Sequence, residues 1–254
     1  VSMAPSVTEL LFAAGGGEKI VGVVSYSDYP EAAKKIANVG DNRQYDMERI
    51  IAMKPDLIVV WMHGSAERQI AMLRQLKVPI YHSDPKKLAD IPNNMERLGQ
   101  LMGTEKVAAP AAAQLRAKLA SLTAQYAQRP PVRLFYQVWD KPLYTISGAS
   151  IISDSMRVCG GQNVFGAMKV VAPVVTAEGV LQENPEAIFA TSEKSDADSE
   201  GGLAMWRAFP SLAAVRNNNL FRLDGDLLNR AGPRMFDGTA AMCADDFKLL
   251  VEIC

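Results

Sequence analysis

The chain has 254 residues, of which 48 % are hydrophobic and 22 % charged, an ordinary composition for a folded globular protein. Its 27 basic and 28 acidic side chains leave a formal net charge of -1. Nucleic acid is therefore excluded as the main partner, because phosphate binding needs a surplus of Lys and Arg. No hydrophobic run approaches the ~20 residues that span a bilayer, and the length suits one large domain or two lobes.

The chain begins with Val rather than Met, and residues 1–3 have the character of a buried strand end. We expect that a leader was removed, so that an export signal would not be visible in this sequence.

Strands and helices alternate along the first part of the chain. A capping box at 6–9 predicts the start of a helix that ends at the three glycines 15–17. The elements expected after it are a strand at 20–24, a helix at 46–53, a strand at 57–61, a helix at 65–76 and a strand at 78–82. This alternation predicts a parallel sheet with both faces covered.

Residues 104–128 differ, because they are rich in Ala, Leu, Lys, Gln and Glu, which favour helix. At 1.5 Å per residue they would form a helix roughly 37 Å long. The alternation then resumes, with strands expected at 132–138, 187–191 and 220–223, helices at 151–159, 176–183 and 233–253, and a polar loop at 191–202. We therefore predict two α/β lobes, 1–103 and 130–254, joined by a rigid helix at 104–129.

An internal repeat supports the two lobes. Residues 47–58 align without a gap with residues 177–188, and each copy is predicted to form a helix, a turn with Pro followed by an acid, and a buried strand. The alternative is that such turns are common between helices and strands. Glu48 and Glu178 are equivalent in the repeat. Either the dipoles of their helices stabilise these carboxylates, or the two residues form matched acidic sites for a partner with paired arginines.

The segments that follow predicted strands should line a cleft between the lobes, since ligands of α/β sheets bind at the carboxyl ends of strands. These segments are aromatic in a chain with only 7 % aromatic residues. The aromatic residues in them are Tyr26, Tyr29, Trp61, Tyr81, Trp139 and Tyr144. Such rings predict a large, flat, partly apolar ligand, although any one of them could instead cover the core.

Polar residues near the strand ends have alternative roles. Asp226 and Arg230 are four residues apart, so they could pair with each other or bind amides and acids of a ligand. The chain has two histidines, His63 and His82, which could be rim residues or could ligate a metal in a bound complex. No motif of a nucleophile elbow, a phosphate loop or a zinc protease occurs, which argues against an enzyme.

The three cysteines are compatible with one disulfide and a free thiol in an exported protein, or with three reduced thiols in the cytosol. Counting alone leaves both possibilities open. The chain has no closely spaced cysteines or Cys–His cluster, so we expect no structural zinc site.

Several segments together resemble the periplasmic substrate-binding proteins of ABC importers, in the class with a rigid helical backbone (class III) that serves cobalamin, ferric siderophores and haem. The resemblance covers essentially the whole chain, and it is strongest to the cobalamin-binding members. The segments that carry it are APSVTELLFAAG, VGVVSYSDYP, MERIIAMKPDLIVVW, AERQ, CGGQNVF, VTAEGVLQENPEAI and NRAGPR.

The resemblance implies a fold, a location and partners. It implies two Rossmann-like parallel-sheet lobes, a periplasmic protein that is free or lipid-anchored, and a monomer that delivers its ligand to a membrane permease driven by an ATPase. The implied ligand is a cobalt corrinoid such as cobalamin, carried as cargo, with no cofactor or metal of the protein's own.

The resemblance also assigns roles to residues. Tyr26, Trp61 and Tyr144 match aromatic corrin contacts, and Asp226 and Arg230 match polar ligand-facing positions. Glu48 and Glu178 match carboxylates that dock onto permease arginines. Cys159 and Cys243 match a disulfide pair, which leaves Cys254 free.

Other positions depart from the pattern. Asn42, Val138 and Ala172 stand where the cobalamin-binding members have bulky aromatics, and Trp139 is expected to substitute from the next position. Asp41 follows Gly40 where many haem binders have tyrosine, which argues against haem ligation there.

Two alternative functions remain from the sequence. The first is a ferric-siderophore or haem binder of the same class, with Tyr45 or a histidine such as His63 as iron ligand. The second, more remote, is a small α/β hydrolase or a metal chelatase that uses His63 or His82.

Overall fold

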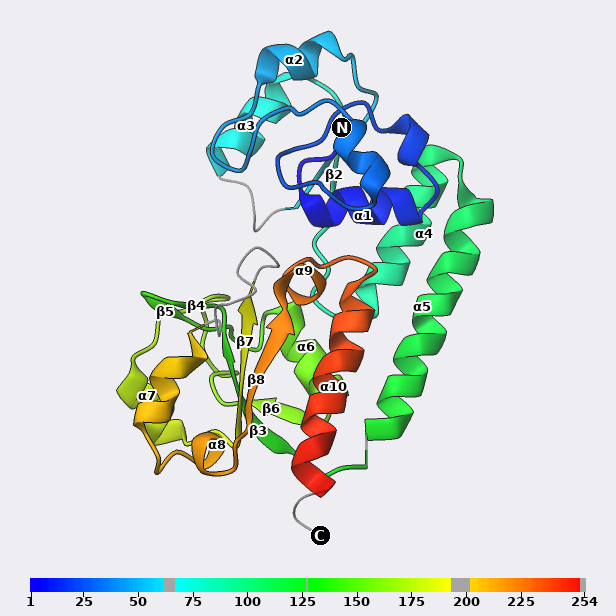
Figure 1. Cartoon of the computed structure of the whole chain (residues 1–254). Helices are drawn as coiled ribbons and strands as arrows, with labels where there is room; N and C mark the ends of the chain where they lie inside the picture. Colours follow the sequence, from blue (N-terminus) through cyan, green and yellow to red (C-terminus); the bar gives the residue numbers. More distant parts are fainter. Residues whose placement is uncertain (62–66, 127, 193–201, 252–254) are drawn as a thin grey trace. The chain divides into compact units, whose positions relative to one another are not determined.

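The computed structural model describes residues 1–61, 67–126, 128–192 and 202–251 (Figure 1). The chain divides into two compact units. Unit 1 comprises 1–85 and 89–116, and unit 2 comprises 86–88 and 117–254. Both are α/β units with parallel strands, as the sequence predicted.

Unit 1 contains a parallel sheet that is built partly from single bridges. Strands β1 (Ile58–Val60) and β2 (Ile80–His82) pair in parallel. Ser2 bridges both Val59 and Val23 in parallel, and Val23 bridges Asn38. The strand expected at 20–24 is therefore wrong in extent, because the chain is paired only around Val23 and turns away at Tyr26, whose φ is 65°.

Unit 1 also contains several helices and 3-10 turns. Helix α1 (Pro5–Ala13) begins at Pro5 after Ala4, with no side-chain cap. The expected capping box at 6–9 is wrong, because proline at the first helical position, with its φ already fixed, starts the helix earlier. The other helices are α2 (Met47–Ala52), α3 (Glu67–Gln75) and α4 (Asp90–Met102), with 3-10 turns at Gly17–Lys19 and Glu31–Lys35.

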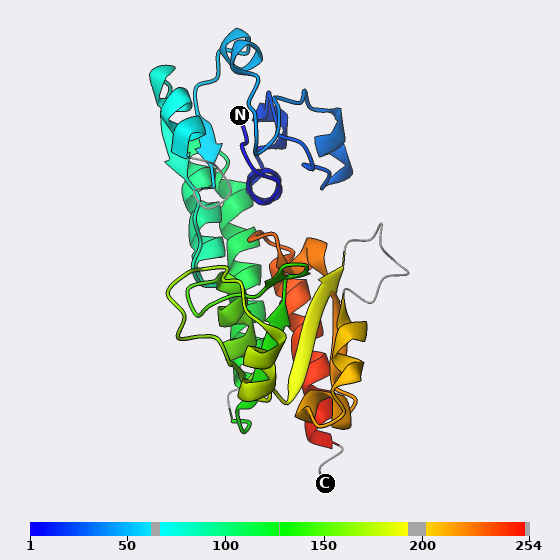
Figure 2. The ribbon, with the colours of Figure 1, turned by 90° about the vertical axis from the view of Figure 1, so that its left-hand side faces the viewer.

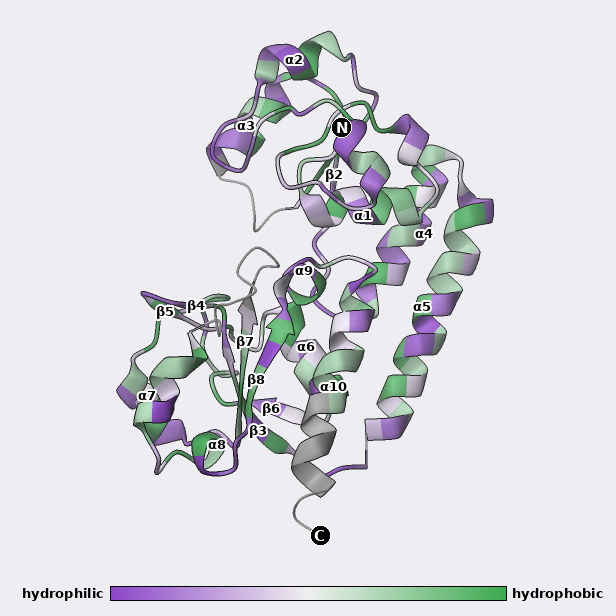
Figure 3. Cartoon of the chain, in the orientation of Figure 1, coloured by the Kyte–Doolittle hydropathy of each residue, from purple (hydrophilic) through white to green (hydrophobic). Residues whose placement is uncertain are grey.

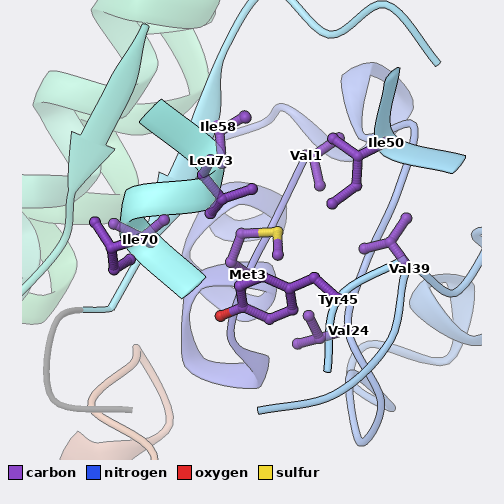
Figure 4. Packing of buried hydrophobic residues seen from close by; sticks show 10 residues of the cluster. Val1, Met3, Val24, Val39, Tyr45, Ile50, Ile58, Ile70 and Leu73 are labelled. Carbon is purple, nitrogen blue, oxygen red and sulfur yellow. The ribbon is translucent and has the colours of Figure 1, made fainter. Parts of the chain in front are cut away.

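The core of unit 1 gathers side chains from the sheet, α2 and α3. Figure 4 shows Met3 against the ring of Tyr45, with Val24 close to the same ring. The cluster comprises Val1, Met3, Val24, Val39, Tyr45, Ile50, Ile58, Val60, Ile70 and Leu73. Tyr45 is only 6 % exposed, so the ring of this expected ligand-binding residue already has a structural role in the core.

Helix α5 (Glu105–Tyr126) is one continuous helix of 22 residues, seen from a second direction in Figure 2. The boundary between the units falls inside it, after Arg116. Within unit 1, Gly99 of α4 lies so close to α5 that an added Cβ would be 2.4 Å from the Cβ of Ala108. Arg116 also donates to both carboxylate oxygens of Glu96, at 2.7 and 2.6 Å, which attaches α5 to α4.

Unit 2 is built on a four-stranded sheet in the order β6-β3-β7-β8, and every pair in it is parallel. The strands are β3 (Val132–Gln137), β6 (Gly161–Asn163), β7 (Ala187–Ser192) and β8 (Leu220–Asp224). Figure 1 shows α6 (Ile151–Val158) and α10 (Met235–Val251) on one face, and α7 (Ala177–Glu183) and α8 (Ala213–Arg216) on the other. Trp206 is fully buried, and its ring meets Phe135 edge to face at 5.6 Å.

A disulfide joins Cys159, at the end of α6, to Cys243 of α10. The pairing implied by the resemblance is therefore confirmed, whereas Cys254 lies outside the described residues. Both half-cystines are buried, and nearby the hydroxyls of Thr239 and Ser155 are 2.9 Å apart.

Hydrophobic and hydrophilic residues are mixed along the helices. Figure 3 shows hydrophobic and hydrophilic residues alternating along α4 and α5. Among the helices of the described residues, none has the length and apolar character needed to cross a membrane.

Candidate functional site

The segment around Tyr26 presents an aromatic ring at the carboxyl end of the unit 1 sheet. Tyr26 is 79 % exposed and has a left-handed backbone, which places it on a turn. The turn is fixed on both sides, because the Ser25 amide donates to the Gly40 carbonyl at 2.8 Å and the Thr8 hydroxyl donates to Ser27 Oγ at 3.1 Å. The ring is therefore held out from a rigid base and is accessible to a ligand.

Trp61 lies at the same edge of the sheet. It follows β1 directly and is half-buried. The chain segments through Val23 and Val59 are separated by the segment through Ser2. Two strand spacings of about 4.8 Å separate the segments that precede Tyr26 and Trp61 by about 10 Å.

The other predicted residues of unit 1 have mixed positions. Asn42 is exposed on a turn fixed by Asp41, whose carboxylate accepts from the amides of Arg43 and Gln44 at 2.8 and 2.9 Å. These two hydrogen bonds lower the pKa of Asp41. Tyr81 is half-buried and donates to Asn94 at 2.9 Å, which favours the structural alternative for this ring.

The structure describes one of the two histidines. His82 ends β2 and is exposed, while His63 lies outside the described residues. In the part of the chain that the structure describes, no group of three or more His, Cys, Asp and Glu side chains could hold a metal ion.

In unit 2, the chain forms an antiparallel hairpin after β3 that the sequence did not predict. Strand β4 (Trp139–Asp140) pairs with β5 (Leu143–Tyr144), and the turn contains a cis peptide bond between Lys141 and Pro142. Trp139 and Tyr144 are direct partners in the register, and they are 61 % and 36 % exposed. The hairpin thus brings together the two aromatic residues expected to contact ligand in this unit.

Asp226 and Arg230 follow β8. The guanidinium of Arg230 lies 3.0 Å from Asp226 Oδ1, and their side chains are only 15 % and 27 % exposed. Asp226 is in the short helix α9 (Gly225–Leu228), whose first turn is capped by the carboxylate of Asp224 at 2.9 Å. The alternative of a mutual ion pair is therefore confirmed, and this pair orients both groups.

Glu48 and Glu178 occupy the same place in their helices. Each is the second helical residue, after caps at Asp46 and Thr176 whose side chains accept from the third helical amide at 2.9 and 3.1 Å. Both carboxylates are exposed. The repeat thus presents two matched acidic side chains, one in each unit.

Two further residues escaped the sequence analysis. Gln69 in the first turn of α3 is 6 % exposed, and neither atom of its amide has a hydrogen-bond partner among the described residues. Val174 is 53 % exposed and bridges Tyr144 in antiparallel fashion. No motif identified them, although Gln69 ends the AERQ segment.

Comparisons with known proteins cover nearly the whole chain. The profile of a family described as "Periplasmic binding protein" matches residues 1–227. A vitamin B12-binding protein of Vibrio cholerae is 39 % identical over 244 residues, which cover 96 % of this chain and 87 % of the relative. That of Vibrio parahaemolyticus is 37 % identical over 243 residues, with 96 % and 87 % covered.

Solved structures agree with these relatives. The crystal structure of the periplasmic vitamin B12 binding protein BtuF of Vibrio cholerae has a TM-score of 0.90 at 38 % identity, covering 98 % of this chain and 96 % of that one. The periplasmic heme-binding protein RhuT from Roseiflexus sp. RS-1, in apo form, has a TM-score of 0.82 at 21 % identity, covering 98 % and 97 %. At that identity the second likeness shows a shared fold only.

Proposed function

The chain belongs to the periplasmic binding protein family, and from that premise we propose that it binds cobalamin or a related corrinoid and delivers it to the permease of an ABC importer. The family is one of binding proteins, so the chain is not an enzyme. The observation that carries the proposed ligand is the 39 % identity to a vitamin B12-binding protein over 96 % of the chain.

We propose that both units contribute ligand contacts. In unit 1 these are Tyr26 and Trp61 with Asn42, Tyr45 and His63, and in unit 2 they are Trp139, Tyr144, Asp226 and Arg230. A corrin ring is large, flat and partly apolar, so exposed aromatic rings can stack on it. Its amide side chains can accept from Arg230 and donate to Asp226, and the ion pair between these two residues positions both groups.

Delivery requires a partner in the membrane. We propose that Glu48 and Glu178 bind arginines of the permease, because both are exposed and occupy equivalent positions in the repeat. We further propose that the chain acts as a monomer in the periplasm, as two lobes at 1–103 and 130–254 joined by the helix at 104–129.

Calorimetric titration of the purified protein with cyanocobalamin tests the ligand. We expect binding of one ligand per chain at micromolar concentration or tighter, and a matching thermal stabilisation of about 2.7 kcal/mol at a hundredfold excess over the Kd. Haem and a ferric hydroxamate siderophore are titrated separately as the alternative ligands. Binding of either of these without any heat from cyanocobalamin would overturn the corrinoid assignment.

A further inference from the structure

Three apolar side chains form a row across the hairpin of unit 2 and the segment beside it. Tyr144 pairs with Trp139 on one side and with Val174 on the other, in antiparallel register. Directly opposed residues of antiparallel strands point to the same face. Their exposed fractions are 61 % for Trp139, 36 % for Tyr144 and 53 % for Val174, so this face is open.

The neighbouring residues point the other way. Leu143 is 6 % exposed, Thr145 is fully buried, and Val175 packs against the buried cluster that contains Leu143. The alternation along the strands therefore places one side of this small sheet in the core and the other outside. The outer side of an antiparallel sheet is normally polar, whereas here the three paired positions are all apolar.

Hydrogen bonds hold the row in place. The Thr145 amide donates to the Pro173 carbonyl at 3.0 Å, and the Val175 amide donates to the Leu143 carbonyl at 2.9 Å. These bonds flank Tyr144 and Val174, which makes them a non-hydrogen-bonded pair, the kind in which side chains lie closest. The indole of Trp139 donates to the Lys141 carbonyl at 3.1 Å, so the ring needs no polar partner from a ligand.

We infer that Val174 is a specificity-determining residue and that the row of Trp139, Tyr144 and Val174 contacts the flat face of a planar macrocycle. The inference rests on the proposed function. Three strands span two spacings, about 10 Å, which suits a broad flat ring better than a compact chelate. Exposed apolar surface held by a rigid scaffold is typical of a binding site.

A small residue, Ala172, lies two positions before Val174 in the chain. Ala172 stands where the resemblance implies an aromatic, and it is exposed. Ala172 and Val174 are both exposed and Pro173 between them is buried, an alternation that places Val174 on the same side of the chain as Ala172. Val174 thus provides apolar surface beside the position at which this chain lacks a large ring.

The substitution Val174→Thr tests the inference, because it keeps the shape of the side chain and replaces one methyl group with a hydroxyl. We expect the Kd for cyanocobalamin to rise about fivefold, since a methyl contact is lost and a hydroxyl is desolvated. The matched control is Val21→Thr, at a valine that is 45 % exposed in unit 1 and for which we expect an unchanged Kd. Thermal unfolding should be the same for both variants and the parent.

A double-mutant cycle with Trp139→Ala gives a second readout. If both residues contact one ring, the two losses should not add, whereas independent sites give additive losses. An unchanged Kd in Val174→Thr, with tight binding by the parent, would overturn the inference and leave the proposed function intact. If the parent binds haem but not cyanocobalamin, the proposed corrinoid ligand is wrong while the inference about the row can still hold. A fivefold loss of haem affinity in Val174→Thr would then support that inference. A parent that binds neither macrocycle overturns both.

Discussion

Lys54 and Asn184 have the same left-handed backbone at equivalent positions of the internal repeat. Their φ angles are 46° and 44°. Each follows a short helix and precedes a proline that leads into a parallel strand, β1 in one copy and β7 in the other. The helices are also anchored alike, because Ile50 and Val180 are both fully buried. The repeat is therefore a repeat of backbone geometry as well as of sequence.

Because the backbone geometry is the same and the side chains differ, we expect substitution by glycine to have opposite effects on stability at the two positions. Lys54→Gly should stabilise unit 1 by up to about 1 kcal/mol, because glycine adopts the left-handed region without the usual steric cost. Asn184→Gly should destabilise unit 2 by about 1 kcal/mol, since Asn184 Oδ1 accepts from the Ala213 amide at 2.9 Å and asparagine already tolerates this conformation. Urea unfolding of the two variants measures both changes, and shifts of the same sign would contradict this account.

The elements that the sequence predicted correctly have strong local signals. The helix over 176–183 has a threonine cap and an asparagine at its end, and α7 is observed with both. Helix α4 was missed because Pro92, Asn93, Asn94 and Gly99 lower its helix propensity, although Ile91, Met95 and Leu98 are buried on one side. Strand β6, with the sequence Gly-Gln-Asn, has no strand propensity and exists because β3 pairs with it.

The exposed ring of Tyr26 gives a binding test that is separable from stability. Tyr26→Ala should raise the Kd for cyanocobalamin at least tenfold, about 1.4 kcal/mol, through loss of a stacking surface. Because Tyr26 is 79 % exposed, the unfolding midpoint should stay within error. Tyr26→Phe is the control, with affinity close to the parent. Equal affinities for all three proteins would remove Tyr26 from the site.

Glu48 and Glu178 should matter for transport and not for binding. In cells that depend on the importer, Glu48→Gln and Glu178→Gln should each reduce cobalamin uptake, and the double variant should reduce it further. Calorimetry should give an unchanged Kd, because the substitutions remove charge from exposed side chains at the helix starts. Glu183→Gln in α7 is a useful contrast, since Glu183 pairs with Arg133 at 2.8 Å and belongs to the structure of unit 2. Normal uptake by the double variant would contradict the docking role.

The disulfide should contribute substantially to the stability of unit 2. Cys159 and Cys243 are 84 residues apart, and closing a loop of that length restricts the unfolded chain by about 3 kcal/mol or more. The variant with Cys159→Ser and Cys243→Ser should lose about this much in urea unfolding. Reduction of the parent by dithiothreitol should lower its midpoint similarly, while the double variant should not respond to the reductant. A parent insensitive to reduction would contradict the prediction.

The site was predictable where it follows strand ends and not where it depends on pairing. Tyr26, Trp61 and Asp226 were identified because parallel strands end at one edge of a sheet. Val174 could not be found in this way, because it lies beside Tyr144 only through an antiparallel bridge between residues 30 positions apart in the sequence. Gln69 was invisible for a related reason, because a sequence does not show which polar side chains are buried without partners.

Gln69 gives the remaining prediction. Its amide is buried without a hydrogen-bond partner among the described residues, and leaving such a group unsatisfied costs about 1–3 kcal/mol. Gln69→Leu should therefore stabilise the ligand-free protein by about 1 kcal/mol or more in urea unfolding. Gln75→Leu, at an exposed position of the same helix, should change the stability by no more than about 0.5 kcal/mol. A loss of stability in Gln69→Leu would contradict the burial cost, because it would mean that the amide forms favourable interactions in the folded protein.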